Sequence, residues 1–131
     1  MDVTQLLDSI PTPSADDVKH HNSRARHYTL VFLRKGPADR ADEARDTRLQ
    51  LEHLQYRMKL HLLGKLALNG PTLADHDILG IGVYAAELDE ALALAQADPK
   101  VKAGYLIAEA IPWMAVATLK NFSNAREASD E

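Results

Sequence analysis

The chain has 131 residues, of which 46% are hydrophobic and 26% charged, and its formal net charge is −4. This length predicts a single domain, since chains divide into several cores only beyond roughly 250 residues. The slight acidic excess supplies none of the clustered cations that bind nucleic acid, and the lack of cysteine excludes disulfides and thiol chemistry. No stretch approaches the roughly 20 apolar residues of a membrane helix, and the acidic, proline-broken start is unlike a secretory signal. We expect a soluble cytoplasmic protein without a membrane or nucleic-acid partner.

The two ends of the chain differ from its middle. Residues 1–26 contain two prolines and little periodic apolar content, so we expect a partly ordered extension, either with one helical turn at 6–10 docked on the domain or loosely held. Residues 120–131 are polar and acidic and predict a flexible tail. The folded domain is therefore expected over residues 27–119.

The domain is predicted to begin with a strand and a long amphipathic helix. Residues 27–34 are rich in β-branched and aromatic side chains and run into a Gly-Pro pair, which is typical of a strand. The helix is predicted to end at Gly64, while its start is left open between residues 38 and 46. Arg57 marks one of its polar positions. Its apolar stripe is predicted from side chains at three- and four-residue steps: Leu51, Leu54, Met58 and Leu62.

Three further strands and a second helix complete the predicted domain. They are a short strand at 66–69, a strand at 78–86, a helix at 88–97 and a last strand at 105–117. Gly80 and Gly82 lie on one face of their strand, where they permit close approach of a helix or mark a bulge. Pro112 interrupts the last strand and indicates a bulge or an edge position.

The order of these elements, βαββαβ, predicts an α+β fold of the ferredoxin-like type. With each helix as a right-handed crossover, four strands form one antiparallel sheet and both helices cover the same face. The other face is then open, although the run at 30–33 places apolar side chains on both faces. Because a sheet that is apolar on both faces is buried on both, we expect a homodimer packed sheet to sheet, or a higher homo-oligomer.

One combination of motifs points to a known family. The chain contains the stretches YTLVFLRKGP, LEHLQYRMKLHLLGKLALNGP and ALAQADPKVKAGYLIAEAIPW. In this combination it resembles the YciI-like, or YCII-related, proteins over about residues 27–115. The resemblance implies a ferredoxin-like fold, pairing into a dimeric α+β barrel, and an active site of one histidine and one aspartate, which correspond to His53 and Asp98. It also implies acid–base chemistry on small organic molecules, including dehydrohalogenation-type eliminations.

His53 and Asp98 also have a chemical rationale of their own. The two predicted helices lie side by side in this fold, so these side chains could meet. A carboxylate that accepts a hydrogen bond from one imidazole nitrogen fixes the tautomer and raises the basicity of the other nitrogen, which makes a general base or acid. A structural interpretation stays open, because Asp98 before Pro99 could cap a turn and His53 could be a hydrogen-bonded helix histidine.

The other histidines give weaker signals. His61 follows His53 by eight residues, about 80° around an ideal helix, which does not favour joint use. The run Asp75-His76-Asp77 is interpreted as a solvated loop, because adjacent residues rarely converge on one ion. We therefore expect no metal site.

The remaining candidates are interpreted as structural. Arg34 and Lys35 end the first strand, where they could attract an anionic substrate, although a solvated strand end is the favoured interpretation. Tyr105 and Trp113 lie at the two ends of the last strand, and Trp113 is expected to pack at the dimer seam rather than line a pocket. No P-loop, dinucleotide fingerprint or serine-hydrolase elbow occurs in the sequence, so we expect no cofactor.

Two functions from different classes follow from these patterns. The first is a small dimeric enzyme without a cofactor, in which His53, oriented by Asp98, performs elimination or hydrolysis-type chemistry on a small molecule. The second is a non-catalytic dimer of the same fold that binds a small ligand or serves as an accessory protein. The sequence does not identify the substrate, because one fold and one dyad serve many chemistries.

Overall fold

The computed structural model describes residues 2–128. They divide into two compact units, one spanning residues 27–114 and the other formed by the segments before and after it. Of the predicted flexible tail, residues 129–131 lie outside the described residues.

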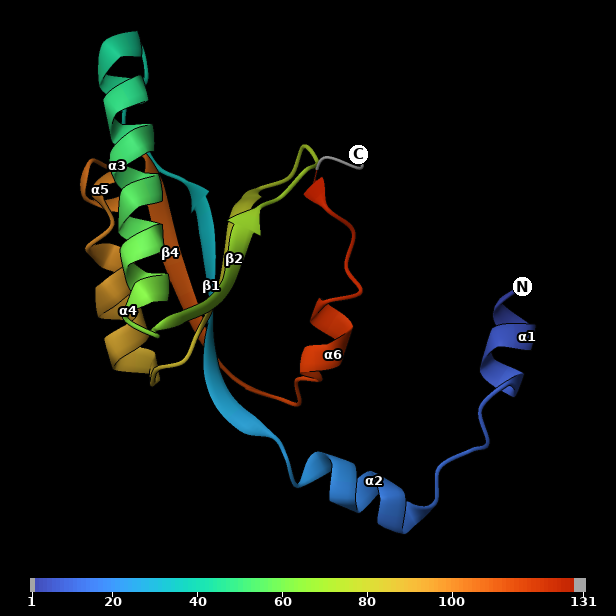
Figure 1. The fold of residues 1–131 in the computed structure, drawn as a ribbon. Helices are drawn as coiled ribbons and strands as arrows, with labels where there is room; N and C mark the ends of the chain where they lie inside the picture. Colours follow the sequence, from blue (N-terminus) through green and yellow to red (C-terminus); the bar gives the residue numbers. More distant parts are fainter. Residues whose placement is uncertain (1, 129–131) are drawn as a thin grey trace. The chain divides into compact units, whose positions relative to one another are not determined.

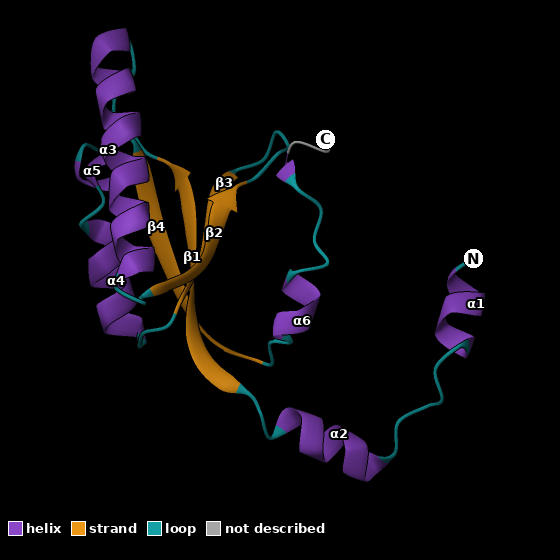
Figure 2. Cartoon of the chain, in the orientation of Figure 1, coloured by secondary structure: helices purple, strands orange, loops and turns teal. Residues whose placement is uncertain are grey.

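The larger unit is an α+β structure with one four-stranded antiparallel sheet, and its helices lie together on one face of that sheet (Figures 1 and 2). Its elements are β1 (Arg26–Lys35), α3 (Glu43–Leu62), β2 (Leu66–Pro71), β3 (Ile78–Tyr84), α4 (Leu88–Gln96), α5 (Pro99–Lys102) and β4 (Leu106–Ala115). The strand order is β2-β3-β1-β4, which agrees with the predicted ferredoxin-like arrangement. All six predicted elements are present, with ends displaced by at most two residues where the sequence specified them, and the short helix α5 is an addition.

The core of this unit lies between the sheet and the helices. Along β1 the burial alternates, so that Val31 and Leu33 are buried while Leu30 and Phe32 face the other side of the sheet. The buried cluster comprises Val31, Leu33, Leu60, Leu66, Tyr84, Ala91, Ala95 and Leu106. Each fully buried leucine or valine contributes about 1.5–3 kcal/mol relative to an exposed one.

Local signals set both ends of α3. At its start, the side chain of Asp42 accepts a hydrogen bond from the backbone N–H of Arg45 at 3.1 Å, which caps the helix. At its end, Gly64 adopts φ +75°, and the N–H of Lys65 donates to the carbonyl of Leu60 at 3.0 Å. This is a Schellman ending, so the predicted stop at Gly64 is confirmed.

The predicted buried stripe of α3 is wrong. Its four side chains are exposed, with exposed fractions of 53–79%: Leu51, Leu54, Met58 and Leu62. The residues that α3 buries are instead Leu49, Arg57 and Leu60. Arg57, which the sequence marked as a polar outer position, is only 4% exposed. The helix is amphipathic as predicted, but it is turned so that Arg57 is buried together with two leucines outside the predicted stripe.

Gly80 and Gly82 both face the helices. They pair with Leu33 and Val31 of β1, which belong to the buried face of the sheet. A Cβ at Gly82 would lie 3.2 Å from the ring of Tyr84, so the predicted close approach is present there. One irregularity in pairing is next to Gly80, because Leu33 pairs with Gly80 and Arg34 with Ile78, and another lies in β2.

The smaller unit contains three short helices. They are α1 (Val3–Asp8), α2 (Ala15–Asn22) and α6 (Leu119–Phe122). Both α1 and α2 begin with a capping box, in which the N-cap side chain and the third helical residue satisfy each other's backbone N–H. The extension therefore contains two helices where one helical turn was expected.

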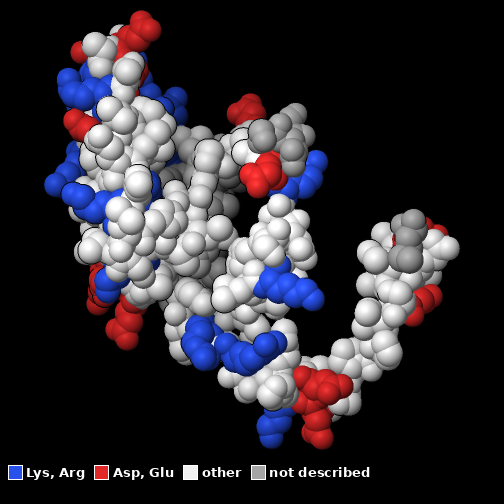
Figure 3. Space-filling model, viewed as in Figure 1, with Lys and Arg blue, Asp and Glu red and all other residues white. Residues whose placement is uncertain are grey.

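Charged side chains gather over the helices of the larger unit, with acidic and basic groups interspersed (Figure 3). Within residues 2–128, no helix combines the length and apolar composition that crossing a membrane requires.

Candidate active site

Asp98 is positioned by the turn between α4 and α5. It is the N-cap residue of α5, where its Oδ1 accepts a hydrogen bond from the backbone N–H of Lys100 at 2.9 Å, and Pro99 occupies the first helical turn. The structural interpretation of Asp98 as a cap is therefore correct. The side chain is also fully buried, which is unusual for a carboxylate and requires compensating partners.

His53 is the first of these partners. It lies on the inner face of α3, and its Nδ1 is 2.7 Å from Oδ2 of Asp98. Because an ionised carboxylate only accepts hydrogen bonds, Nδ1 carries the hydrogen, and the neutral ring then has its lone pair on Nε2. The described residues offer Nε2 no hydrogen-bond partner, and the side chain is 14% exposed. The imidazole is thus fixed at one nitrogen and available at the other.

Arg57 is the second partner, one helical turn after His53. Its Nε lies 3.1 Å from the same Oδ2 of Asp98, as an ion pair outside hydrogen-bond geometry, and its Nη1 donates to the hydroxyl of Tyr84 at 2.7 Å. Burial raises the pKa of Tyr84, and the neighbouring guanidinium opposes that rise. Within the described part of the chain, the buried Nη2 of Arg57 has no hydrogen-bond partner. Arg57 therefore balances the buried charge of Asp98, while its Nε and Nη2 both lack a hydrogen-bond partner in that part of the chain.

The sequence reasoning missed Arg57, although a signal was present. Residues four apart on a helix share a face, so placing His53 in a site also places Arg57 there. The predicted apolar stripe of α3 indicates a different inner face of the helix, and Arg57 lies outside that stripe.

A cleft of about 210 Å³ opens beside His53, between α3 and the sheet. Leu33, Leu79 and Leu106 supply apolar walls, and Gly80 leaves the sheet side open because it has no side chain. The other polar lining residues are Arg40, Gln50, Arg57, Asn69 and Lys100. A cavity of about 150 Å³ in another protein accepts benzene, so this cleft has room for a substituted aromatic ring or a molecule of similar size.

The other sequence candidates lie outside the cleft. Arg34 pairs with Glu109 at 3.1 Å, and neither Arg34 nor Lys35 is a lining residue. His61 is exposed, with its Nε2 2.5 Å from Oδ1 of Asn69. Trp113 is 43% exposed and also lies outside the lining.

The histidine and acidic side chains of the described residues do not gather into a metal site. His76, in the predicted solvated loop, uses its Nδ1 to accept the backbone N–H of Ile78 at 2.9 Å. Residues 2–128 contain no group of three or more histidine or acidic side chains arranged to hold a metal ion.

Comparison with protein families identifies the family of this chain. A model of the YCII-related domain matches residues 28–114. The chain belongs to the YCII-related domain family. A similar solved structure is 5-chloro-2-hydroxyhydroquinone dehydrochlorinase (TftG) from Burkholderia phenoliruptrix AC1100 in complex with 2,5-dihydroxybenzoquinone. It is 23% identical, with a TM-score of 0.49, over 66% of this chain and 92% of that chain. A search of curated proteins finds no match.

The YCII-related segment contains the whole cleft. Residues 28–114 include every lining residue, together with Asp98 behind His53. The membership that the sequence motifs indicated is therefore confirmed. The geometry brings His53 and Asp98 together, while their part in a reaction stays a prediction. Chemically, the YCII-related site has one free imidazole nitrogen facing a cleft of mixed polarity, which suits transfer of a proton to or from a small molecule.

Proposed function

We propose that this YCII-related protein is a small-molecule enzyme that works without a cofactor and uses His53 as its general acid–base group. One observation carries the proposal: Nδ1 of His53 is 2.7 Å from the fully buried carboxylate of Asp98, while the ring lines the cleft. A buried carboxylate that holds one imidazole nitrogen and leaves the other open is the arrangement that general-base catalysis uses.

The proposed step is an elimination or a hydrolysis-type reaction. In an elimination, Nε2 of His53 takes a proton from carbon, the C–H electron pair forms the new double bond, and the leaving group departs with its bonding electrons. In a hydrolysis, Nε2 takes a proton from water while the water oxygen forms a bond to an electrophilic carbon, and the leaving group departs with the electrons of its bond to that carbon. The imidazolium formed in either case is stabilised by Asp98, and it returns the proton to the leaving group or to solvent.

The alternative is a non-catalytic ligand-binding or accessory protein. In that case Asp98 serves as the cap of α5 and as the counter-ion of Arg57, and His53 completes the hydrogen bonding of a buried carboxylate. Both functions use the same cleft, so turnover and not binding separates them.

Matched histidine variants test the proposal. Chlorinated hydroquinones are suitable first compounds, with chloride release as the assay, because elimination of halide is among the reactions that the resemblance implies. His53→Gln should lower turnover by about 10²–10⁴-fold, the usual contribution of a general acid–base group. His76→Gln, an equal change in an exposed loop, should keep full turnover. Equal turnover in the two variants would contradict the role of His53, and saturable binding without turnover would favour the alternative.

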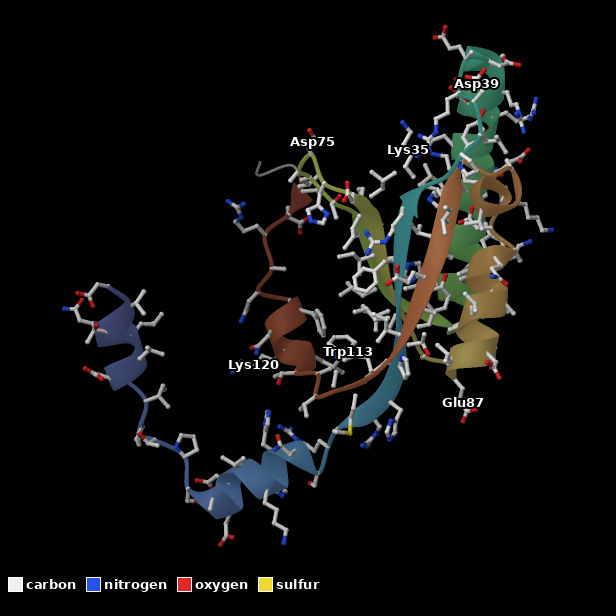
Figure 4. The ribbon with its side chains drawn as sticks, turned by 180° about the vertical axis from the view of Figure 1, so that it is seen from behind. Lys35, Asp39, Asp75, Glu87, Trp113 and Lys120 are labelled. Atoms are coloured by element: carbon white, nitrogen blue, oxygen red, sulfur yellow. The ribbon has the colours of Figure 1, made fainter. Side chains whose placement is uncertain are left out.

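We also propose that a second copy of the chain covers the outer face of the sheet. Trp113 lies on the side of the sheet away from the helices (Figure 4). Apolar side chains on this face remain substantially exposed, at 38–52%: Leu68, Ile81, Ile107, Ile111 and Trp113. Contiguous apolar surface of this kind marks an association site, and a two-fold sheet-to-sheet pair would bury the same residues of both copies. The dimeric α+β barrel that the resemblance implies is such a pair.

The proposal includes a cytoplasmic location. It rests on the cysteine-free composition, which suits a reducing compartment. Cell fractionation followed by immunoblotting tests it, and recovery outside the cytoplasmic fraction would contradict it.

A further inference from the structure

The cleft beside His53 is cationic, although the protein as a whole is acidic. Three permanently or normally positive side chains line it, Arg40, Arg57 and Lys100, and its lining within the described residues includes no aspartate or glutamate. The chain as a whole has a formal net charge of −4, so the charge of the residues that line the cleft is opposite in sign to that of the chain. Asp98, behind the lining, pairs with Arg57, so Arg40 and Lys100 are the lining cations that have no ion-pair partner in the described residues.

Arg57 supplies the clearest unmet demand. It is 4% exposed and lines the cleft, and its Nη2 has no hydrogen-bond partner among the described residues. A buried donor without an acceptor is unfavourable, and more so for a charged group, so buried donors are normally paired. Nη1 donates to the hydroxyl of Tyr84, and Nε, although 3.1 Å from Oδ2 of Asp98, also has no hydrogen-bond partner among these residues. An oxygen atom of a ligand in the cleft would supply the acceptor that Nη2 of Arg57 lacks.

Arg40 and Lys100 are held beside the same cleft. Arg40 donates to the carbonyl of Tyr105 at 2.6 Å and lies over its ring, with 5.0 Å to the ring centroid. The ammonium of Lys100 donates to Oε1 of Gln50. In the described part of the chain, neither Arg40 nor Lys100 forms an ion pair.

The two cations repel each other. Burial lowers the pKa of Lys100, and the nearby Arg40 lowers it further, while Asp98 and Asp46 oppose these effects. An anion between Lys100 and Arg40 would remove that repulsion. The pair is therefore better arranged to receive a negative charge than to stabilise the empty protein.

We propose that these three side chains bind an oxyanion of the substrate, so that the substrate is a small organic anion with an apolar body, of the arylcarboxylate type. Leu33, Leu79 and Leu106 would contact the body, and the oxyanion would lie toward the cations. This inference rests on the proposed function for the placing of the reacting atoms next to His53, but anion binding itself does not require turnover. Guanidinium groups suit planar oxyanions, because their N–H donors match the spacing of two carboxylate oxygens.

Benzoate and benzamide are the probes, because they share a ring and nearly the same shape but differ in charge. Each is titrated into the isotope-labelled full chain, and the shifts of backbone amide signals are followed by NMR. We expect benzoate to bind about tenfold more tightly than benzamide, as a charge-assisted contact should, and added salt to weaken benzoate alone.

Two lysines of the short helix α5 give a matched pair of variants. Lys100 lines the cleft, whereas Lys102 is exposed and does not. Lys100→Gln should weaken benzoate by about fivefold and leave benzamide unchanged, while Lys102→Gln should alter neither. Arg40→Gln provides a second test from a different segment, with the same expected direction. Far-ultraviolet circular dichroism checks that each variant is folded.

The outcomes separate this inference from the proposed function. Equal affinity for benzoate and benzamide, no benzoate binding, or equal effects of Lys100→Gln and Lys102→Gln would each overturn the anion site. If these occur while His53-dependent turnover is observed, the anion inference alone fails. If benzoate selectivity is observed and His53→Gln leaves turnover unchanged, the anion site stands and the proposed role of His53 fails.

Discussion

Asp98→Asn would remove the one negative charge on which the buried part of the site depends. The carboxylate is fully buried and has three contacts: Nδ1 of His53 at 2.7 Å, the backbone N–H of Lys100 at 2.9 Å, and Nε of Arg57 at 3.1 Å. Asparagine has the same shape and is an equally good helix cap, so the contact with α5 should survive. The change therefore isolates the charge from the cap.

The magnitude follows from the partner left behind. Arg57 is 4% exposed, and without Asp98 its positive charge would have no counter-ion within ion-pair distance in the described residues. Removing one partner of a buried ion pair costs about 3–5 kcal/mol. Because the whole free energy of unfolding of a small domain is about 5–15 kcal/mol, Asp98→Asn should be folded but close to its limit.

Urea denaturation at neutral pH, followed by circular dichroism, measures this difference. The midpoint should fall while the slope with urea stays the same, since the surface exposed on unfolding is unchanged. The double variant Asp98→Asn/Arg57→Met removes both charges and should recover most of the loss, because neutral replacements of a whole buried pair are often harmless. If Asp98→Asn lies within about 1 kcal/mol of the original chain, as an exposed ion pair would, the reasoning about this buried pair is refuted.

Three other substitutions test separate features. A Cβ at Gly80 would have ordinary contacts, the nearest at 3.4 Å, so Gly80→Val should remain folded and fill the cleft, with loss of benzoate shifts in NMR titrations. Ile107 and Leu51 are similarly exposed, at 51% and 58%, but only Ile107 faces the proposed dimer contact. Ile107→Glu should therefore give monomers in analytical ultracentrifugation, whereas Leu51→Glu should not. Burial raises the pKa of Tyr84 above the ordinary tyrosine value of 10.0, so the neutral phenol is favoured in the fold, and the free energy of unfolding should decline as the pH rises above that ordinary value. Tyr84→Phe should flatten this decline in urea titrations at several pH values.

Each of these expectations has a result that contradicts it. Unchanged benzoate shifts in Gly80→Val would place the ligand elsewhere. A dimer that survives Ile107→Glu, or is lost in Leu51→Glu, would move the contact from the sheet to the helices. An equally steep alkaline decline in Tyr84→Phe would assign the effect to other groups, of which Tyr56 also has a pKa raised by burial.

The strands and the helix ends were predictable because their signals are local. A run of β-branched residues gives β1, and Gly64 ends α3 whatever the rest of the chain does. The orientation of α3 was not predictable in this way. Periodicity shows that a helix has two unlike faces, but the neighbouring elements decide which face is inside. Here the inward face carries Arg57 between two leucines, and the predicted apolar stripe lies outside.

The residues of the candidate site also differ in whether the sequence predicts them. His53 and Asp98 came from the family resemblance, and the chemistry of the two residue types supported the choice. Arg40 and Lys100 are 60 residues apart in the chain, and contacts between the segment after β1 and the segment after α5, such as the hydrogen bond from Arg40 to the carbonyl of Tyr105, bring them to one cleft. For Arg34 and Lys35 the sequence favours a solvated strand end over a place at the pocket, and Arg34 is paired with Glu109 outside the cleft.

The several contacts of Asp98 affect how descendants of such a protein would evolve. The carboxylate caps α5, neutralises Arg57 and fixes the ring of His53. A lineage that had lost the chemistry would still be under selection to retain the carboxylate for folding, and could discard it only together with the arginine. A histidine–aspartate pair would then persist as a relic in inactive relatives. In this fold, the presence of the pair alone would be a poor guide to which members are enzymes, and the state of the cationic cleft beside it would be a better one.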